Sequence, residues 1–336
     1  MELFAIPGNP VPSNAFVGSV VTSDGVTLRY ARWRPTSRRT LGTICLIQGR
    51  AEFIEKYFET ITQLRRRGFA VVAFDLRGQG GSERLLSDAR KGHVDDFAEY
   101  GEDISTILQS VMIPSMPKPY FAIAHSMGAA ALLLALERGE TRFERVVLLA
   151  PLIGLVGMKF SGLASAAASI LDFLALGTRY VPTGGATSLA TKPFAGNRLS
   201  SDPVRYQRVA DIVAARPRLA LGDPTIRWTF AMFQMFKRFA ERDFGRRLVV
   251  PSLMLIPGAD PLCSSHAAEA LAARIRACQP VIIPGARHEI LTERDSYRAQ
   301  FFAAFDRFIP GETHEQDLLS QDAHEGLIEG HQFPES

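Results

Sequence analysis

Short apolar runs alternate with helix-like patterns through most of the chain, and this alternation limits the possible folds more than any other feature. The runs cover residues 42–49, 69–75, 120–126, 145–151, 248–258 and 280–285. The helix-like segment 52–67 shows the intervening pattern well, with apolar residues on one face at Ile54, Tyr57, Ile61 and Leu64. Continuously apolar strands need cover on both faces. The sequence therefore predicts an α/β protein with a mainly parallel central sheet and helices on both faces.

Two segments depart from this alternation. Residues 152–248 contain helical patterns but no strand-like run, so we predict a helical cap inserted between two core segments, 1–151 and 249–310. The C-terminal segment 311–336 is acidic, with seven acidic residues and no lysine or arginine from Glu312 onward. A segment with that charge and few apolar anchors is expected to be mobile.

The N-terminal region predicts a β-hairpin. Residues 19–33 form two extended runs around Asp24-Gly25, which predicts a hairpin at an antiparallel edge of the sheet.

Three features of the sequence bear on where the protein lies in the cell. The stretch MELFAIPGNPVPSN has no basic residue and three prolines, so it fits no secretory signal. The most apolar part of the chain is interrupted by Lys159 and Asp172, which leaves no membrane span. With three cysteines and no disulfide framework, we expect a cytoplasmic protein.

Charge is distributed unevenly along the chain. The formal net charge of +3 is too small to indicate nucleic-acid binding, and no arginine-rich arm appears. Residues 152–250 nevertheless carry fourteen Lys/Arg against six Asp/Glu, a local charge of +8. Such a surface could attract a phosphate headgroup or an anionic membrane, which would place the protein peripherally at the inner membrane face. An ordinary solvated helical surface explains the same charge equally well.

Residues 124–128 read AHSMG and nearly match G-x-S-x-G, the turn that presents a nucleophilic serine between a strand and a helix. Gly128 keeps the second glycine of the motif. Ala124 replaces the first, which is tolerable if the backbone there stays in an allowed region. Ser126 is therefore either a nucleophile or an ordinary polar residue where an apolar strand becomes a helix, and the pentapeptide alone leaves both interpretations open.

A serine nucleophile needs a base and a carboxylate that orients the base, and in this kind of sheet they follow in the order serine, acid, histidine. Asp260 comes just after the apolar run LMLIP, and His288 comes just after VIIPG. Both would lie at the carboxyl edge of a parallel sheet, where active sites collect. Each residue alone could be an ordinary loop residue, but the ordered set favours a triad with Ser126. The adjacent His125 is expected to point away from the serine and to pack internally.

Acyl transfer also needs N–H donors for the negative oxygen of its intermediate. We predict the backbone N–H groups of Met127, directly after the serine, and of Arg50, in the loop after CLIQG. The DLRGQGGS segment fits neither nucleotide-binding glycine motif, and its Asp75 and Arg77 are predicted to form a structural pair. Histidines and cysteines lack metal-ligand spacing, so we expect no metal and no cofactor.

Residues 228–236, WTFAMFQMF, supply large apolar side chains suited to an acyl chain. The candidate substrate contacts are Trp228, Phe233 and Phe236. Packing of the cap onto the core is the plainer explanation of the same side chains.

The chain resembles the α/β-hydrolases of the lysophospholipase and monoacylglycerol lipase branch, over roughly residues 17–309 by element order. The resemblance rests on the motifs QGRAEFIEKY, DLRGQGGS, AHSMG, NRLSSDPVRY, PGADPLCS and GARHEI. It implies the α/β-hydrolase fold with a helical cap over the site. It also implies that Ser126 is the nucleophile, Asp260 the acid and His288 the base.

The same resemblance implies hydrolysis of a fatty-acyl ester, with a lysophospholipid as the leading substrate. A monoacylglycerol lipase or a broad carboxylesterase is the alternative, because neutral esters need the same chemistry. An aminopeptidase is disfavoured, because the free amine of a peptide calls for carboxylates in the cap. The other remaining class is a non-catalytic binding protein on a hydrolase scaffold.

One position departs from the family pattern. Gln48 stands where the family has the histidine of an HG loop, which puts substrate contacts in question. The partners implied are a small lipid ester and an anionic membrane surface, with no nucleic acid; the oligomeric state is not predicted.

Overall fold

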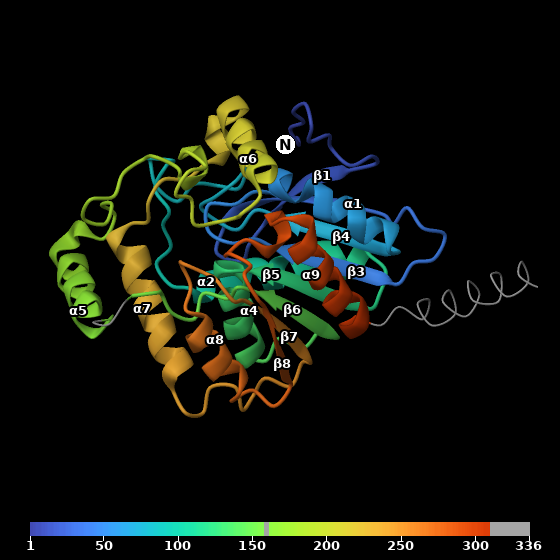
Figure 1. The fold of residues 1–336 in the computed structure, drawn as a ribbon. Helices are drawn as coiled ribbons and strands as arrows, with labels where there is room; N and C mark the ends of the chain where they lie inside the picture. The colour runs from blue at the N-terminus through green and yellow to red at the C-terminus, as the bar shows by residue number, and fades with distance from the viewer. Residues whose placement is uncertain (158–160, 310–336) are drawn as a thin grey trace, which may run out of the picture.

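The computed structural model describes residues 1–157 and 161–309, and an eight-stranded sheet forms its centre (Figure 1). The strand order is β1-β2-β4-β3-β5-β6-β7-β8. β2 pairs antiparallel with both β1 and β4, whereas the remaining pairs are parallel. The strands are β1 Phe16–Val21, β2 Thr27–Trp33, β3 Gly42–Ile47, β4 Phe69–Phe74, β5 Tyr120–His125, β6 Arg145–Leu149, β7 Ser252–Pro257 and β8 Cys278–Ile283. The predicted α/β architecture with a mainly parallel sheet is confirmed.

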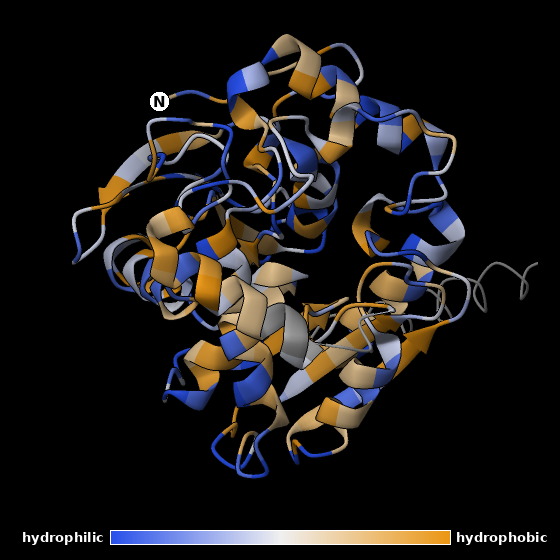
Figure 2. Cartoon of the chain, turned by 90° about the vertical axis from the view of Figure 1, so that its left-hand side faces the viewer, coloured by the Kyte–Doolittle hydropathy of each residue, from blue (hydrophilic) through white to orange (hydrophobic). Residues whose placement is uncertain are grey.

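Helices cover both faces of the sheet because successive side chains of a strand point to opposite faces. In β3, Ile44 and Leu46 belong to an apolar cluster with α1 and α9, whereas Cys45 and Ile47 belong to a cluster with α2, α4 and α8. The central strands in Figure 2 are mostly coloured hydrophobic, while many outer loops are hydrophilic. The helices of the sheet layers are α1 Phe58–Arg66, α2 Ala98–Ile107, α3 Ile113–Ser115, α4 Met127–Glu137, α8 Ser265–Ala272 and α9 Asp295–Phe308.

Between β6 and β7 the chain leaves the sheet and forms α5 Ser161–Leu171, α6 Pro203–Ala215 and α7 Ile226–Ala240. Within the described part of this segment no strand joins the sheet. α7 contributes to the same apolar cluster as α2 and α4, while α6 packs Ile212 and Val213 against Phe53 of the core. These helices lie where the cap is predicted, and its boundaries at 152 and 248 stay a prediction.

Arginines of the α6 and α7 region form ion pairs with acidic side chains that belong to the predicted core. The pairs are Arg205–Glu59 at 2.7 Å, Arg205–Asp295 at 2.6 Å, Arg208–Glu59 at 2.7 Å, Arg227–Asp95 at 3.5 Å and Arg238–Glu137 at 2.6 Å. Part of the local positive charge is therefore matched by core carboxylates. The basic side chains of this region are therefore neither all free in solvent nor all without acidic partners.

The predicted hairpin forms, with Gly25 at a φ of 89° between β1 and β2. Helix α8 ends at Ala272, because the following residues turn the chain back toward β8. No helix among the described residues is long and apolar enough to cross a membrane. The predicted mobile tail, 311–336, lies outside the described residues.

Candidate active site

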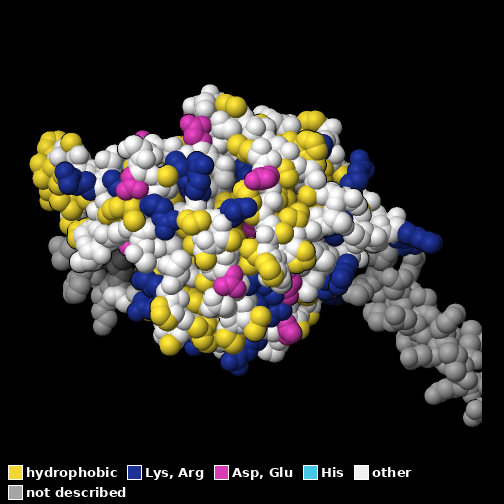
Figure 3. All heavy atoms as spheres, turned by 90° about the horizontal axis from the view of Figure 1, so that it is seen from above, with side chains coloured by type: hydrophobic (Ala, Val, Ile, Leu, Met, Phe, Trp, Pro, Cys, Tyr) yellow, Lys and Arg dark blue, Asp and Glu magenta, His cyan; other side chains and the backbone are white. Residues whose placement is uncertain are grey.

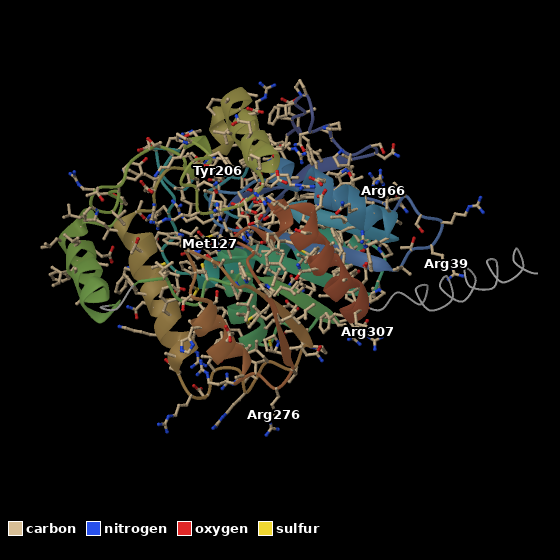
Figure 4. The ribbon with its side chains drawn as sticks, viewed as in Figure 1. Arg39, Arg66, Met127, Tyr206, Arg276 and Arg307 are labelled. Carbon is tan, nitrogen blue, oxygen red and sulfur yellow. The ribbon has the colours of Figure 1, made fainter. Side chains whose placement is uncertain are left out.

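Ser126 lies at the sharp turn between β5 and α4. Its φ of 51° and ψ of −113° are outside the regions that residues with a side chain favour. The turn is held because the Ser126 amide donates a hydrogen bond to the carbonyl oxygen of Leu149 in β6, at 2.9 Å. Figure 4 labels the next residue, Met127, near the centre of the molecule and below Tyr206 of α6. The turn thus directs the serine into a pocket that Tyr206 also lines.

The two small residues around the serine have different roles. Ala124 is an ordinary residue of β5, paired with Ile47 and Leu148, and its backbone does not enter the positive-φ region. At Gly128, by contrast, an added Cβ would lie 2.3 Å from the carbonyl oxygen of Gln48 and 2.9 Å from the Ile47 side chain. The missing first glycine is therefore harmless, and the second glycine is required by the close approach of the β3 end.

We expect Gly128→Ala to destabilise the fold by about 1–3 kcal/mol, because a methyl group cannot occupy space held by backbone. Making room for the methyl group would also displace the loop after β3, so the rate of ester hydrolysis should fall. Ala124→Gly is the matched control and should cost at most about 1 kcal/mol, the usual penalty of glycine in a strand. Thermal unfolding and ester turnover check both; a Gly128→Ala protein with wild-type stability would contradict the steric argument.

The three residues predicted as a triad lie together and are connected by hydrogen bonds. Ser126 Oγ is 3.0 Å from His288 Nε2, and His288 Nδ1 is 2.7 Å from Asp260 Oδ2. The other carboxylate oxygen of Asp260 accepts hydrogen bonds from the backbone N–H groups of Leu262 and Cys263, at 2.8 and 3.0 Å. A carboxylate held this way fixes the proton of His288 on Nδ1. Nε2 is then free to accept the serine proton.

Burial opposes the charged imidazolium of His288, but the Cys263 sulfur and the Asp260 carboxylate outweigh it and raise the pKa of His288 to about 9. A general base must be neutral, so kcat/KM should rise with pH and level off above about 9. A pH profile on a water-soluble ester checks this. Cys263→Ala should move the midpoint to lower pH, and an unmoved midpoint would argue against the contribution of the sulfur.

The two predicted oxyanion donors lie next to the site, because Met127 directly follows Ser126 and Arg50 lines the pocket. Among the described residues, the backbone N–H groups of Met127 and Arg50 have no hydrogen-bond acceptor in the protein. The loop that carries Arg50 is held by Gln79, whose Oε1 accepts from the Ala51 amide at 3.1 Å and whose Nε2 donates to the Gly49 carbonyl at 2.8 Å. Two free amides on a fixed backbone are what an oxyanion hole requires.

A buried ionic cluster that we did not predict lies in the wall of the pocket. Lys56 Nζ is 2.7 Å from carboxylate oxygens of both Glu52 and Glu289. His125 Nδ1 is 2.9 Å from Glu52 Oε1, and His125 Nε2 is 3.2 Å from the carbonyl oxygen of His288. Glu52 also accepts the Gly49 amide hydrogen bond at 2.5 Å. The cluster therefore connects the loop after β3 with the loop that carries His288.

This cluster corrects the expected role of His125. The ring makes no hydrogen bond to Ser126, as predicted, but it is an ionic partner of Glu52 and not a simple packing residue. Burial opposes protonation of His125, and the Glu52 carboxylate outweighs it and raises the pKa of the ring. In the sequence, the one feature that could have indicated the cluster was the four-residue spacing of Glu52 and Lys56. Nothing local in the sequence indicated that Glu289 would join them.

A second buried network corrects two other expectations. Arg77 does not pair with Asp75; it pairs with Asp103 at 2.7 Å, whereas Asp75 pairs with Arg29 at 2.6 Å. Gln48 Nε2 donates to Asp75 Oδ1 at 2.8 Å, and the Gln48 side chain is fully buried outside the pocket wall. The glutamine in place of the family histidine therefore supports the loop and is not among the residues that line the pocket.

The site opens into a pocket of about 240 Å³ whose wall is mainly apolar. Trp228 and Met232 of α7 line it, but Phe233 and Phe236 do not. Trp228 and Met232 share one helix face, Phe233 lies about 100° around the helix, and Phe236 lies one turn further along. The expected acyl contacts are therefore corrected to Trp228 and Met232. The remaining apolar wall residues are Leu152, Leu155, Leu189, Ala190, Leu199, Val209 and Leu262.

Asp260, Cys263 and His288 place potential metal-ligand atoms within 4.8 Å of one another. The sequence spacing did not indicate this group, because its members come from loops after two different strands. Two of the three are the predicted acid and base. A metal ion there would occupy the groups that the proton transfer needs, so the cluster suits a triad with an adjacent thiol.

Comparisons with known proteins agree with this geometry. The family described as serine aminopeptidase, S33, matches residues 38–295. Lysophospholipase L2 of Escherichia coli K12 is 30% identical over 291 residues, which cover 82% of each chain. Monoglyceride lipase of Rattus norvegicus is 28% identical over 249 residues, covering 74% of this chain and 75% of its own.

The fold has close counterparts among solved structures. A soluble variant of monoglyceride lipase from Saccharomyces cerevisiae superimposes with a TM-score of 0.69 at 18% identity, and the match covers 89% of this chain and 96% of the yeast chain. At that identity the likeness concerns the fold. Together with the sequence matches, it shows that the chain belongs to the serine aminopeptidase S33 family, has the α/β-hydrolase fold and is an ester hydrolase.

Proposed function

We propose that the protein is a lipid ester hydrolase that releases the fatty acid from a lysophospholipid. The main support for the proposal is the hydrogen-bonded series Ser126, His288 and Asp260, of which Ser126 and His288 line a mainly apolar pocket. The similarity to the E. coli protein named lysophospholipase L2 supports the same substrate class.

In the proposed reaction, Ser126 Oγ attacks the acyl carbonyl carbon while His288 Nε2 takes the serine proton. The carbonyl oxygen becomes negative and accepts hydrogen bonds from the amides of Met127 and Arg50. Collapse of this intermediate breaks the ester bond, and His288 gives its proton to the departing glycerol oxygen. A water molecule, deprotonated by the same histidine, then attacks the acyl-serine; His288 returns this proton to Ser126 Oγ as the acyl–serine bond breaks, which releases the fatty acid and restores the serine. Asp260 stabilises the imidazolium in both halves of the reaction.

The acyl chain is assigned to the apolar wall around Trp228 and Met232. Their side chains are large, apolar and adjacent to the reacting serine, which suits burial of a hydrocarbon chain at about 25 cal/mol per Å². The substitution Met232→Asp should therefore raise KM for substrates with long acyl chains more than for substrates with short ones. An equal effect on short and long chains would argue against acyl contact.

A monoacylglycerol lipase or a broad carboxylesterase is the second candidate, favoured by the likeness to the rat and yeast monoglyceride lipases. Lysophospholipids and monoacylglycerols with the same acyl chain separate the two. We expect a higher kcat/KM on the lysophospholipid. Equal or faster cleavage of the monoacylglycerol would overturn the lysophospholipid assignment and leave the ester hydrolase in place.

Aminopeptidase activity, which the family description names, is disfavoured by the charges in the pocket. A peptide substrate would need a carboxylate for its free amine. Glu52 and Glu289 do line the pocket, but both are ion-paired with Lys56. We expect no cleavage of an aminoacyl amide under conditions where an ester of the same acid is hydrolysed.

We also propose that the predicted cap, 152–248, brings the protein to an anionic membrane surface at the cytoplasmic face. Phe173 is 89% exposed, and the nearby Ile170 and Leu174 are about 60% exposed. Figure 3 shows hydrophobic side chains at the same end of the molecule as α5 in Figure 1, with Lys and Arg beside them. This combination suits an interfacial lipid contact.

Co-sedimentation with phosphatidylglycerol vesicles tests the membrane proposal. Phe173→Asp should lower binding, whereas Val204→Asp, at an exposed apolar residue of α6, should not. Equal binding by both variants, or equal binding of the wild type to neutral vesicles, would contradict it.

A further inference from the structure

The side chain of Arg50 lies in the wall of the active-site pocket and forms no ion pair with any carboxylate that the structure describes. Its Nη2 donates to the carbonyl oxygen of Gly222, and its Nε is buried with no hydrogen-bond partner among the described residues. The guanidinium carbon lies 5.5 Å from the centre of the Trp228 ring. A Cβ added to Gly92 would lie 2.9 Å from Nη2. The guanidinium is therefore packed in one position, although most of its donor capacity is unused.

Arg50 differs in this respect from Arg29 and Arg77, two fully buried guanidinium groups that are each matched by carboxylates within 3 Å. Among the described residues no carboxylate forms an ion pair with Arg50, and burial lowers the pKa of its guanidinium. Burying a charge without a partner costs free energy, and an anion in the pocket would offset that cost.

The other cations of the pocket wall are already engaged. Lys56 contacts the carboxylates of Glu52 and Glu289, and His125 contacts Glu52. These two cations and two carboxylates compensate one another, so the cluster neither attracts an anion strongly nor repels one. Among the residues that the structure describes, Arg50 is the one cationic side chain of the pocket wall outside this cluster and the proposed catalytic groups.

We propose that the Arg50 guanidinium binds the phosphate of the substrate headgroup, a proposal that rests on lysophospholipid hydrolysis as the function of the site. The backbone amide of Arg50 is one of the proposed oxyanion donors, so one residue would hold both ends of the same glycerol unit. In a lysophospholipid the glycerol carbons separate the ester from the phosphate. The arginine side chain separates its own amide from its guanidinium by a comparable extended length. The planar guanidinium also presents paired N–H donors, which match two phosphate oxygens.

The test compares two substrates with the same acyl chain, lysophosphatidylglycerol and monoacylglycerol, which differ by the phosphate-bearing headgroup. The readout is the ratio of kcat/KM for the phospholipid to kcat/KM for the monoacylglycerol, so any general effect on catalysis cancels. Arg50→Met should lower this ratio by about 10- to 100-fold, the range of a charge-assisted hydrogen bond. Arg50→Lys keeps the charge and should recover part of the ratio. Arg198→Met removes an exposed cap arginine outside this pocket wall and should leave the ratio unchanged.

Three results would overturn the proposal. An unchanged ratio in Arg50→Met would show that the guanidinium does not recognise the phosphate. Equal losses in Arg50→Met and Arg50→Lys would show that packing against Trp228, and not charge, explains the effect. A lowered ratio in Arg198→Met would likewise assign the preference to the general charge of the cap.

A binding measurement separates this proposal from the proposed function. Ser126→Ala protein, with and without Arg50→Met, is titrated calorimetrically with a short-chain lysophosphatidylglycerol below its micelle concentration. We expect Kd to rise about tenfold or more when Arg50 is replaced. If the wild type cleaves no lysophospholipid, the proposed function fails, while this titration still decides whether Arg50 binds the headgroup. Inorganic phosphate should bind much more weakly; equally tight binding would identify a free-anion site and contradict headgroup recognition.

Discussion

Ser126→Ala should abolish ester hydrolysis, lowering kcat by about 10⁴- to 10⁶-fold, the range seen when a nucleophile of this type is removed. Ser126 lines the pocket, and its Oγ lies 3.0 Å from His288 Nε2. Without it His288 has no nucleophile to activate. Slow residual turnover by water, aided by the oxyanion donors, is all that would remain.

The variant should fold normally, because it removes one hydroxyl whose protein partner is His288. Thermal unfolding therefore serves as the internal check, and Ser23→Ala, at an exposed hairpin serine, serves as the matched control with unchanged turnover. Wild-type kcat in Ser126→Ala, with the fold intact, would remove the basis of the proposed mechanism.

Asp260→Asn should lower kcat by about 10⁴-fold, through the tautomer of His288. The Asp260 oxygen that accepts from the Leu262 and Cys263 amides can be replaced by the asparagine oxygen without loss. The asparagine NH₂ then faces His288 Nδ1. This nitrogen must accept a hydrogen bond from the NH₂ group, so it can no longer carry a proton. The proton moves to Nε2, and that nitrogen can no longer accept from the serine.

Single-turnover kinetics on an activated ester measure this effect, with Asp211→Asn at an exposed cap carboxylate as the control. Because the substitution keeps the size and the backbone hydrogen bonds of the side chain, we expect little change in thermal stability. A loss of less than about tenfold would mean that Asp260 does not orient the base, since triad acids of this kind contribute far more.

Much of the fold and of the proposed triad followed from local patterns. Apolar strands and intervening helices determine a parallel sheet, and parallel strands bring their carboxyl ends to one edge. Asp260 and His288 were therefore expected near Ser126, although 162 residues separate the serine from the histidine. The two proposed oxyanion donors, the backbone amides of Met127 and Arg50, could be predicted from the same edge of the sheet. The position of a backbone amide depends on the course of the chain and not on the identity of the side chain.

The features that could not be predicted depend on how separate elements pack. Helical periodicity gives α7 an apolar face, but only its docking determines that Met232 and not Phe233 faces the pocket. The close approach of the Gln48 carbonyl to Gly128 likewise arises from the end of another strand. Lys56 meets Glu289 across the site because two loops converge there, and neither loop carries a sequence signal for the other.

Labelling with a fluorophosphonate probe tests the central claim most directly, because the probe reacts with an activated serine and needs no knowledge of the substrate. We expect one adduct, located by mass spectrometry on Ser126, that forms on the folded protein. It should not form on protein denatured beforehand, and lysophospholipid should slow its formation. Labelling should also be lost in His288→Ala, which keeps the serine but removes its base. An unlabelled folded protein, or an adduct on another serine, would contradict the account and favour a non-catalytic lipid-binding protein on a hydrolase scaffold.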